Sequence, residues 1–107
     1  MRPIFYDGEL VAVAASTRVF LDSSVAGLPR GHPRRRVVAA LCLYARDIAT
    51  GELPGPYDDI EAERYARSLL IADELFDLVA DENDEGLAKR FAVPVAVIAA
   101  KRLDGER

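Results

Sequence analysis

An apolar stripe over residues 34–50 constrains the fold of this chain more than any other feature of its sequence. Pro33 precedes the stripe and Gly51 follows it, as at the start and the end of a helix. Its apolar members are Val37, Val38, Leu41, Cys42, Tyr44, Ala45 and Ile48. Because the stripe is broader than one helix face, the sequence predicts a central helix that the rest of the chain covers.

Short apolar segments before this helix have the features of β-strands. Residues 4–6, 9–15 and 18–22 form these segments, and an Asp-Gly pair lies at the first turn between them. Residues 25–33 hold two glycines and two prolines, which indicates a loop. The first part of the chain is therefore expected to form an antiparallel sheet of two or three strands.

The second half of the chain has the pattern of several helices. Asp58 or Asp59 can cap the first of these helices. Its expected apolar side is formed by Ile60, Tyr65, Leu69, Leu70 and Ala72. The pattern continues through Leu75, Phe76 and Val79, which favours a separate short helix.

After a turn at residues 81–86, two further helices are expected over residues 87–91 and 95–103. They flank Val93-Pro94, which is the pattern of a helix-turn-helix. The expected fold is α+β, with one domain over residues 1–107. A small antiparallel N-terminal sheet packs on a central helix, and a mostly helical half follows with a helix-turn-helix-like end.

Two residue counts exclude several classes of site. Cys42 is the only cysteine, so the chain has no disulfide framework. His32 is the only histidine, whereas the common zinc-peptidase helix needs two and a zinc finger needs four Cys or His ligands. Cys42 also lies in the most apolar run, where a thiol is a poor nucleophile. No metal, cofactor or catalytic residue is therefore expected.

Neither a membrane span nor a targeting segment is expected. The longest apolar run, residues 37–45, has nine residues, whereas a spanning helix needs about 20. The first residues lack the uninterrupted apolar run of a signal peptide. The sequence thus favours a cytoplasmic protein with no membrane partner.

The charges are divided unequally along the chain. Residues 1–54 have a net charge of +2, and residues 55–107 have a net charge of −6. Basic side chains gather at the start of the central helix, where they oppose the helix dipole at about 0.3–1 kcal/mol each. This cost points to a partner-binding role for Arg30, Arg34, Arg35 and Arg36. The opposing acidic candidates are Asp73, Glu74 and Asp77.

A small DNA-binding regulator is an alternative. Residues 85–103 would supply the DNA contacts, through Lys89, Arg90, Lys101 and Arg102. The second helix begins with the apolar run 95–100, although a helix that reads bases carries polar side chains. A role in packing or protein contact is therefore favoured over DNA binding.

Residues 61–72, Glu-Ala-Glu-Arg-Tyr-Ala-Arg-Ser-Leu-Leu-Ile-Ala, resemble the segment E-A-N-x-F-A-x-x-L-L-M-P of the ImmA/IrrE family of zinc peptidases. Glu63 and Ala72 depart from that pattern. The family's later L-A-x-x-F-x-V-S and closing R-L are matched by Leu87-Ala88, Phe91, Val93 and Arg102-Leu103. The resemblance spans about residues 9–103 in order and spacing.

The family carries H-E-x-x-H on its central helix, where this chain has Leu41, Cys42 and Ala45. Glu61 falls at or near the family's acidic ligand, and a lone carboxylate does not hold zinc. The resemblance therefore implies the fold of a degenerate, metal-free relative without the activity.

Active members of the family bind and cut helix-turn-helix repressors. The resemblance thus implies a non-catalytic interaction module whose partner is a transcription regulator or another cytoplasmic protein. A homo-oligomer and an enzyme of another kind, using Glu61 and His32, stay open as alternatives.

Overall fold

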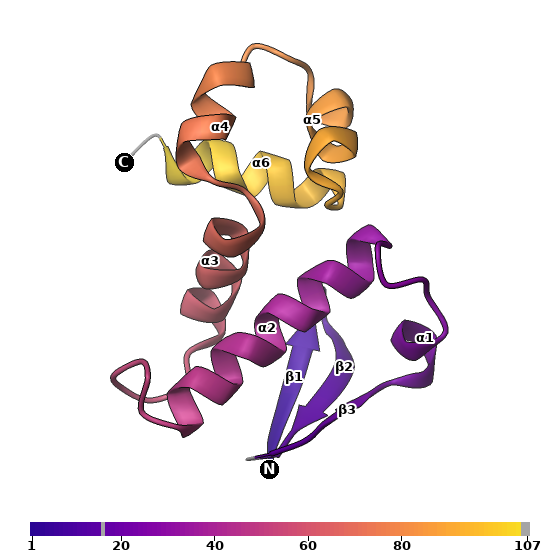
Figure 1. The fold of residues 1–107 in the computed structure, drawn as a ribbon, viewed down its shortest axis with the longest axis vertical. Helices are drawn as coiled ribbons and strands as arrows, with labels where there is room; N and C mark the ends of the chain where they lie inside the picture. Colours follow the sequence, from indigo (N-terminus) through magenta and orange to yellow (C-terminus); the bar gives the residue numbers. More distant parts are fainter. Residues whose placement is uncertain (16, 106–107) are drawn as a thin grey trace.

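The computed structural model describes residues 1–15 and 17–105 and has an α+β fold (Figure 1). An antiparallel sheet comes first and helices follow, which confirms the predicted fold class. In chain order the elements are β1 (Arg2–Tyr6), β2 (Glu9–Ala14), β3 (Val19–Leu21), α1 (Ser23–Ala26), α2 (Pro33–Ala49), α3 (Asp59–Leu70), α4 (Asp73–Val79), α5 (Asp84–Phe91) and α6 (Val95–Asp104).

The sheet has the strand order β1-β2-β3, so β1 and β3 form its two edges. The turn between β1 and β2 consists of Asp7 and Gly8, which both have positive φ angles, 54° and 78°. Two positive φ angles are typical of the type I′ turn, whose twist suits a tight hairpin. The Asp-Gly pair in the sequence therefore fixed the position of the hairpin.

Helix α2 lies across the sheet and forms the centre of the core (Figure 1). It begins at Pro33, and His32 caps it, because the His32 Nδ1 accepts a hydrogen bond of 3.2 Å from the Arg34 backbone N–H. The buried side chains of α2 are Val37, Val38, Ala40, Leu41, Cys42, Tyr44 and Ala45. The predicted covered central helix is confirmed.

Two local expectations are wrong. The loop expected over residues 25–33 includes the end of α1, which forms because the Asp22 carboxylate accepts a hydrogen bond from the Ser24 N–H. The apolar side expected for α3 is also shifted, since Ile60 and Leu69 are 70% and 52% exposed. Small side chains, Ala62 and Ala66, are buried instead and let α3 approach α2 closely.

Helices α4, α5 and α6 gather at the end of the molecule away from the sheet (Figure 1). The side chain of Asn83 caps α5, and Ala92 ends it with a left-handed φ of 53°. The chain then turns through Val93, and α6 follows Pro94. This short connection confirms the predicted helix-turn-helix-like end.

Two arginines tie this end to the rest of the molecule. The Arg36 guanidinium on α2 donates hydrogen bonds to the Phe91 and Ala92 carbonyls at the end of α5. The Arg67 guanidinium on α3 forms a two-point ion pair with the Asp104 carboxylate on α6, at 2.7 and 2.9 Å. Within residues 1–15 and 17–105, no helix has both the length and the apolar character needed to cross a bilayer.

Candidate functional site

The positions where the resemblance expects zinc ligands lie in the apolar core. Leu41, Cys42 and Ala45 on α2 are 1%, 5% and 6% exposed. Glu61 lies on the exposed surface of α3, where its carboxylate accepts a hydrogen bond of 3.1 Å from Arg64. Leucine and alanine offer no donor atom, so these residues do not fit a zinc ion. In the described part of the chain, no three His, Cys, Asp or Glu side chains gather as a metal site would require.

Burial raises the pKa of the Cys42 thiol to about 11, so the thiol is protonated near neutral pH. His32 caps the start of the same helix, and the ten-residue separation between it and Cys42 corresponds to a helical rise of about 15 Å. A Cys–His nucleophile pair is therefore not assembled, as the sequence led us to expect.

Cys42 is expected to react with a thiol reagent at pH 8 about 100-fold more slowly than free cysteine, because the thiolate is the reactive form.

The raised pKa of Cys42 also predicts a pH dependence of the free energy of unfolding. The stabilisation is complete below the ordinary pKa of 9.0 and is lost as the pH rises through about 11. The complete loss is about 2–3 kcal/mol, of which about 2 kcal/mol falls between pH 8 and 10.5. Urea titrations at pH 8 and 10.5 measure it, and Cys42→Ala is the control that must lack it. An equal loss in both proteins would contradict the assignment.

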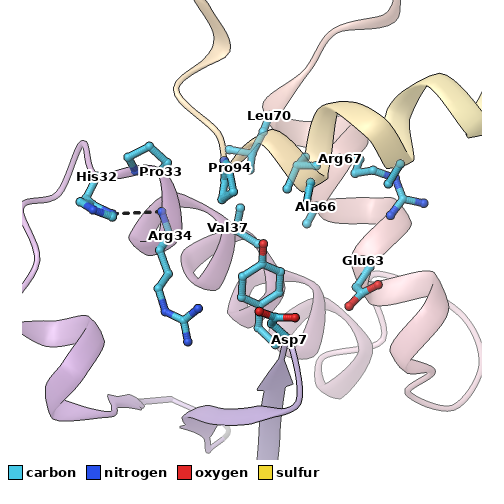
Figure 2. A pocket seen from close by; sticks show the side chains of 14 residues that line it. Asp7, His32, Pro33, Arg34, Val37, Glu63, Ala66, Arg67, Leu70 and Pro94 are labelled. Atoms are coloured by element: carbon cyan, nitrogen blue, oxygen red, sulfur yellow. Dashed lines mark hydrogen bonds between the residues drawn. The ribbon is translucent and has the colours of Figure 1, made fainter. Parts of the chain in front are cut away.

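A cavity of about 550 Å³ lies between the β1–β2 turn, the start of α2, and helices α3 and α6 (Figure 2). Its apolar wall includes Pro33, Val37, Ala66, Leu70, Pro94 and Val97. Its polar rim consists of Tyr6, Asp7, His32, Arg34, Glu63 and Arg67. Figure 2 shows Asp7 from the hairpin and Glu63 from α3 on the same side of this cavity.

Half of the six polar residues of this rim have hydrogen-bond or ion-pair partners, with His32 capping α2 as described above. The Arg34 guanidinium forms an ion pair of 3.1 Å with Glu9, and Arg67 is paired with Asp104. Burial, and then the nearby Asp7 carboxylate, raise the pKa of Tyr6. His32 lines the cavity but Glu61 does not, so the structure does not join the two residues of the enzyme alternative there. The ion pairs of the rim join neighbouring elements of the fold around a cavity whose wall is apolar.

A second cavity, of about 690 Å³, lies between β3, one face of α2 and the end of α3. We call it the arginine groove. Its charged lining consists of Arg18, Arg30, Arg35, Arg36 and Arg46. Its other lining residues are Ala14, Ala15, Thr17, Val19, Leu21, Ala39, Ala40, Cys42, Leu43, Leu69 and Leu70. Among the residues that the structure describes, no aspartate or glutamate lines this groove.

Two arginines of the groove are held in place without losing their charge. Arg35 donates hydrogen bonds to the Ala26 and Leu28 carbonyls, at 3.2 and 2.7 Å. Arg36 donates to the two carbonyls at the end of α5. Carbonyl oxygens are neutral acceptors, so both guanidinium groups keep their full positive charge in the groove.

The other three arginines are less engaged. Arg46 is 3.7 Å from the Asp47 carboxylate, and its side chain is 60% exposed. Arg18 and Arg30 are exposed and form no ion pair with any residue in 1–15 or 17–105. The groove therefore has a strongly positive lining in a chain whose net charge is −4.

The basic cluster predicted from the sequence is divided between the two cavities. Arg30, Arg35 and Arg36 line the arginine groove, whereas Arg34 faces the other cavity and pairs with Glu9. The hydrogen bonds of Arg35 and Arg36 offset the unfavourable position of these charges at the start of α2.

The predicted acidic surface is exposed on α4. Glu74 and Asp77 face solvent there, and the Asp73 carboxylate accepts a hydrogen bond from the Lys101 Nζ. Asp73 is therefore a partner within the chain, and the two other carboxylates keep the surface position predicted for them.

Two of the four side chains predicted to contact DNA are instead paired with other residues of the chain. Lys101 is only 7% exposed and pairs with Asp73. Arg102 pairs with Asp84 at 2.7 Å and also donates to the Ala80 and Glu82 carbonyls. Lys89 and Arg90 are exposed, and Arg90 pairs with Glu82. DNA binding through this helix pair stays a prediction that rests on Lys89 and Arg90.

No family model, curated protein or solved structure matches this chain. Its function must therefore be argued from the arrangement of its own residues.

Two residues of the groove, Arg18 and Arg46, were not among the residues predicted from the sequence. Arg46 lies eleven residues after Arg35, a spacing that returns to nearly the same helix face, so the sequence held a signal for it. Arg18 lines the groove because the residues beside β3 and one face of α2 border the same cavity, which no local pattern indicates.

Proposed function

We propose that this chain is a non-catalytic, ImmA/IrrE-like interaction module that binds another protein through the arginine groove. The proposed partner is a cytoplasmic transcription regulator of the helix-turn-helix class. The observation that carries the proposal is the groove itself, which combines five arginines with an apolar wall and has no carboxylate in its described lining.

A surface of this kind costs free energy unless a partner covers it. Five like charges around one cavity repel one another, and apolar wall residues such as Val19 and Leu69 are 44% and 52% exposed. The packed Leu41, Cys42 and Ala45 support a binding role in place of metal-dependent cleavage.

The test places a photo-crosslinking amino acid at Leu43, a half-buried residue in the groove wall. The matched control places the same amino acid at Leu78 on α4, which is 77% exposed and outside the groove. In cells that express the chain, we expect a discrete cross-linked protein from the Leu43 position and none of that mass from Leu78. The same products from both positions, or none from either, would refute the proposal that a cellular protein binds through the groove.

A further inference from the structure

We propose that the arginine groove binds an extended, acidic peptide segment that pairs with the free edge of β3. The inference rests on the proposed function and specifies the chemistry of the partner. Three features of the groove support it. They are an open strand edge, a helix wall about as long as a short extended peptide, and a positive charge that no carboxylate in the described lining balances.

The strand edge follows from the hydrogen bonds of β3. The Arg18 carbonyl accepts from the Ala15 N–H at 2.8 Å, and the Asp22 N–H donates to the Val11 carbonyl at 2.9 Å. Backbone groups alternate along an antiparallel strand, so those of Val19 and Leu21 point away from β2. Both residues line the groove. In the described parts of the chain, β3 pairs with no strand other than β2, so these groups can pair with an incoming strand.

The opposite wall is one stripe of α2. Arg35, Ala39, Leu43 and Arg46 follow one another at helical spacing and all line the groove. Between Arg35 and Arg46 the helix rises about 16 Å, which matches about five residues of an extended peptide. The stripe carries a cation at each end and small or apolar side chains between them. An occupant with apolar residues flanked by carboxylates fits this order.

The positive charge of the groove favours an occupant with negative charge. Arg35 and Arg36 are fixed by carbonyl acceptors before any ligand arrives, which lowers the entropy cost of binding a carboxylate. Arg18, which directly precedes β3, and Arg30 add two exposed guanidinium groups to the groove. A peptide is favoured over a nucleic acid because the strand edge offers backbone donors and acceptors, and because the wall offers no aromatic side chain for base stacking.

The test uses fluorescence anisotropy with three labelled octapeptides and the full chain. One peptide alternates Glu and Val, one alternates Lys and Val, and one is the Glu-Val peptide with alternate backbone N–H groups methylated. We expect the Glu-Val peptide to bind and the Lys-Val peptide not to bind. The affinity for the Glu-Val peptide should fall at high salt, and the methylated peptide should bind about tenfold or more weakly. Equal binding of the methylated peptide would overturn strand pairing, and equal binding of the Lys-Val peptide would overturn charge selection.

The variant for this test is Arg18→Ala/Arg30→Ala, because neither side chain forms an ion pair with any of the residues that the structure describes. The matched control Lys89→Ala/Arg90→Ala removes the same charge outside the groove. We expect the first pair to weaken binding about tenfold and the control to change it by less than about twofold. Equal losses in both variants would overturn the groove as the site. Tighter binding of a single-stranded oligonucleotide would overturn a peptide as its occupant.

The two proposals can fail separately. A protein that cross-links from Leu43 and binds equally well to Arg18→Ala/Arg30→Ala would support the proposed function and overturn the acidic-strand inference. No cross-linked protein, together with tight binding of the Glu-Val peptide, would leave the site and its chemistry standing without the proposed cellular role.

Discussion

Cys42→Glu is expected to destabilise the chain by about 3–5 kcal/mol at pH 7, because it places a carboxylate in the packed corner of α2. The same site raises the pKa of the native thiol through burial. Because position 42 is only 5% exposed, we expect the desolvation of a carboxylate there to outweigh its attraction to the arginines of the adjoining groove. Its pKa in the folded state must therefore rise. The destabilisation relative to the native chain is expected to be smallest below about pH 4, where the unfolded carboxyl is also protonated, and to grow as the pH rises.

Urea unfolding followed by circular dichroism at pH 4 and pH 7 measures this effect. The control is Ala49→Glu, which adds the same side chain at an exposed position of the same helix and is expected to change stability by less than about 0.5 kcal/mol. If Cys42→Glu were as stable as Ala49→Glu, the corner would be hydrated. Water would then reach the part of α2 around Cys42, as a functioning metal centre requires and a packed core does not allow.

Arg36→Ala is expected to cost about 2–4 kcal/mol of stability, because it leaves the Phe91 and Ala92 carbonyls without their charged donor. These hydrogen bonds join α2 to the turn between α5 and α6, across 55 and 56 residues of sequence. The loss is expected to loosen the C-terminal helices first, so that amide protons of α5 and α6 exchange faster than those of α2.

Hydrogen exchange and urea unfolding together check this prediction. Arg30→Ala removes an arginine of the same groove that makes no ion pair in the described residues, and it should change stability by less than about 0.5 kcal/mol. Arg36→Lys, which keeps the charge but has one compact donor group, is expected to lie between the two. Equal stability of Arg36→Ala and Arg30→Ala would contradict a structural role for Arg36.

Local patterns predicted most of the fold because each element carries its own signal. Pro33 and the stripe after it fixed α2, and the Asp-Gly pair fixed the hairpin turn. The burial of α3 was not predictable in this way. Its apolar residues favoured Ile60 and Leu69 as core, but the close approach of α2 selected Ala62 and Ala66. The side-chain size that fits between two helices depends on how closely they pack, and the hydrophobicity of the residues does not indicate it.

The candidate site was less predictable than the fold. Arginines at the start of α2 stood out by their charge, yet the sequence could not say that Arg34 faces a different cavity from Arg35 and Arg36. Lys101 and Arg102 were predicted as DNA contacts, and the sequence did not indicate that both form ion pairs that hold α6 to its neighbours. Charge is visible in a sequence, whereas the partner that uses it is fixed by the folded geometry.

The unpaired edge of β3 has a consequence for how copies of this protein meet in a crowded cell. An open strand edge normally invites the identical edge of another molecule, which is the first step of aggregation. Here Arg18 adjoins that edge, and Arg30 lies in the same groove. Two such edges brought together would place like charges at short range, so these arginines oppose edge-to-edge pairing of two copies of the protein. The same side chains would attract a negatively charged peptide.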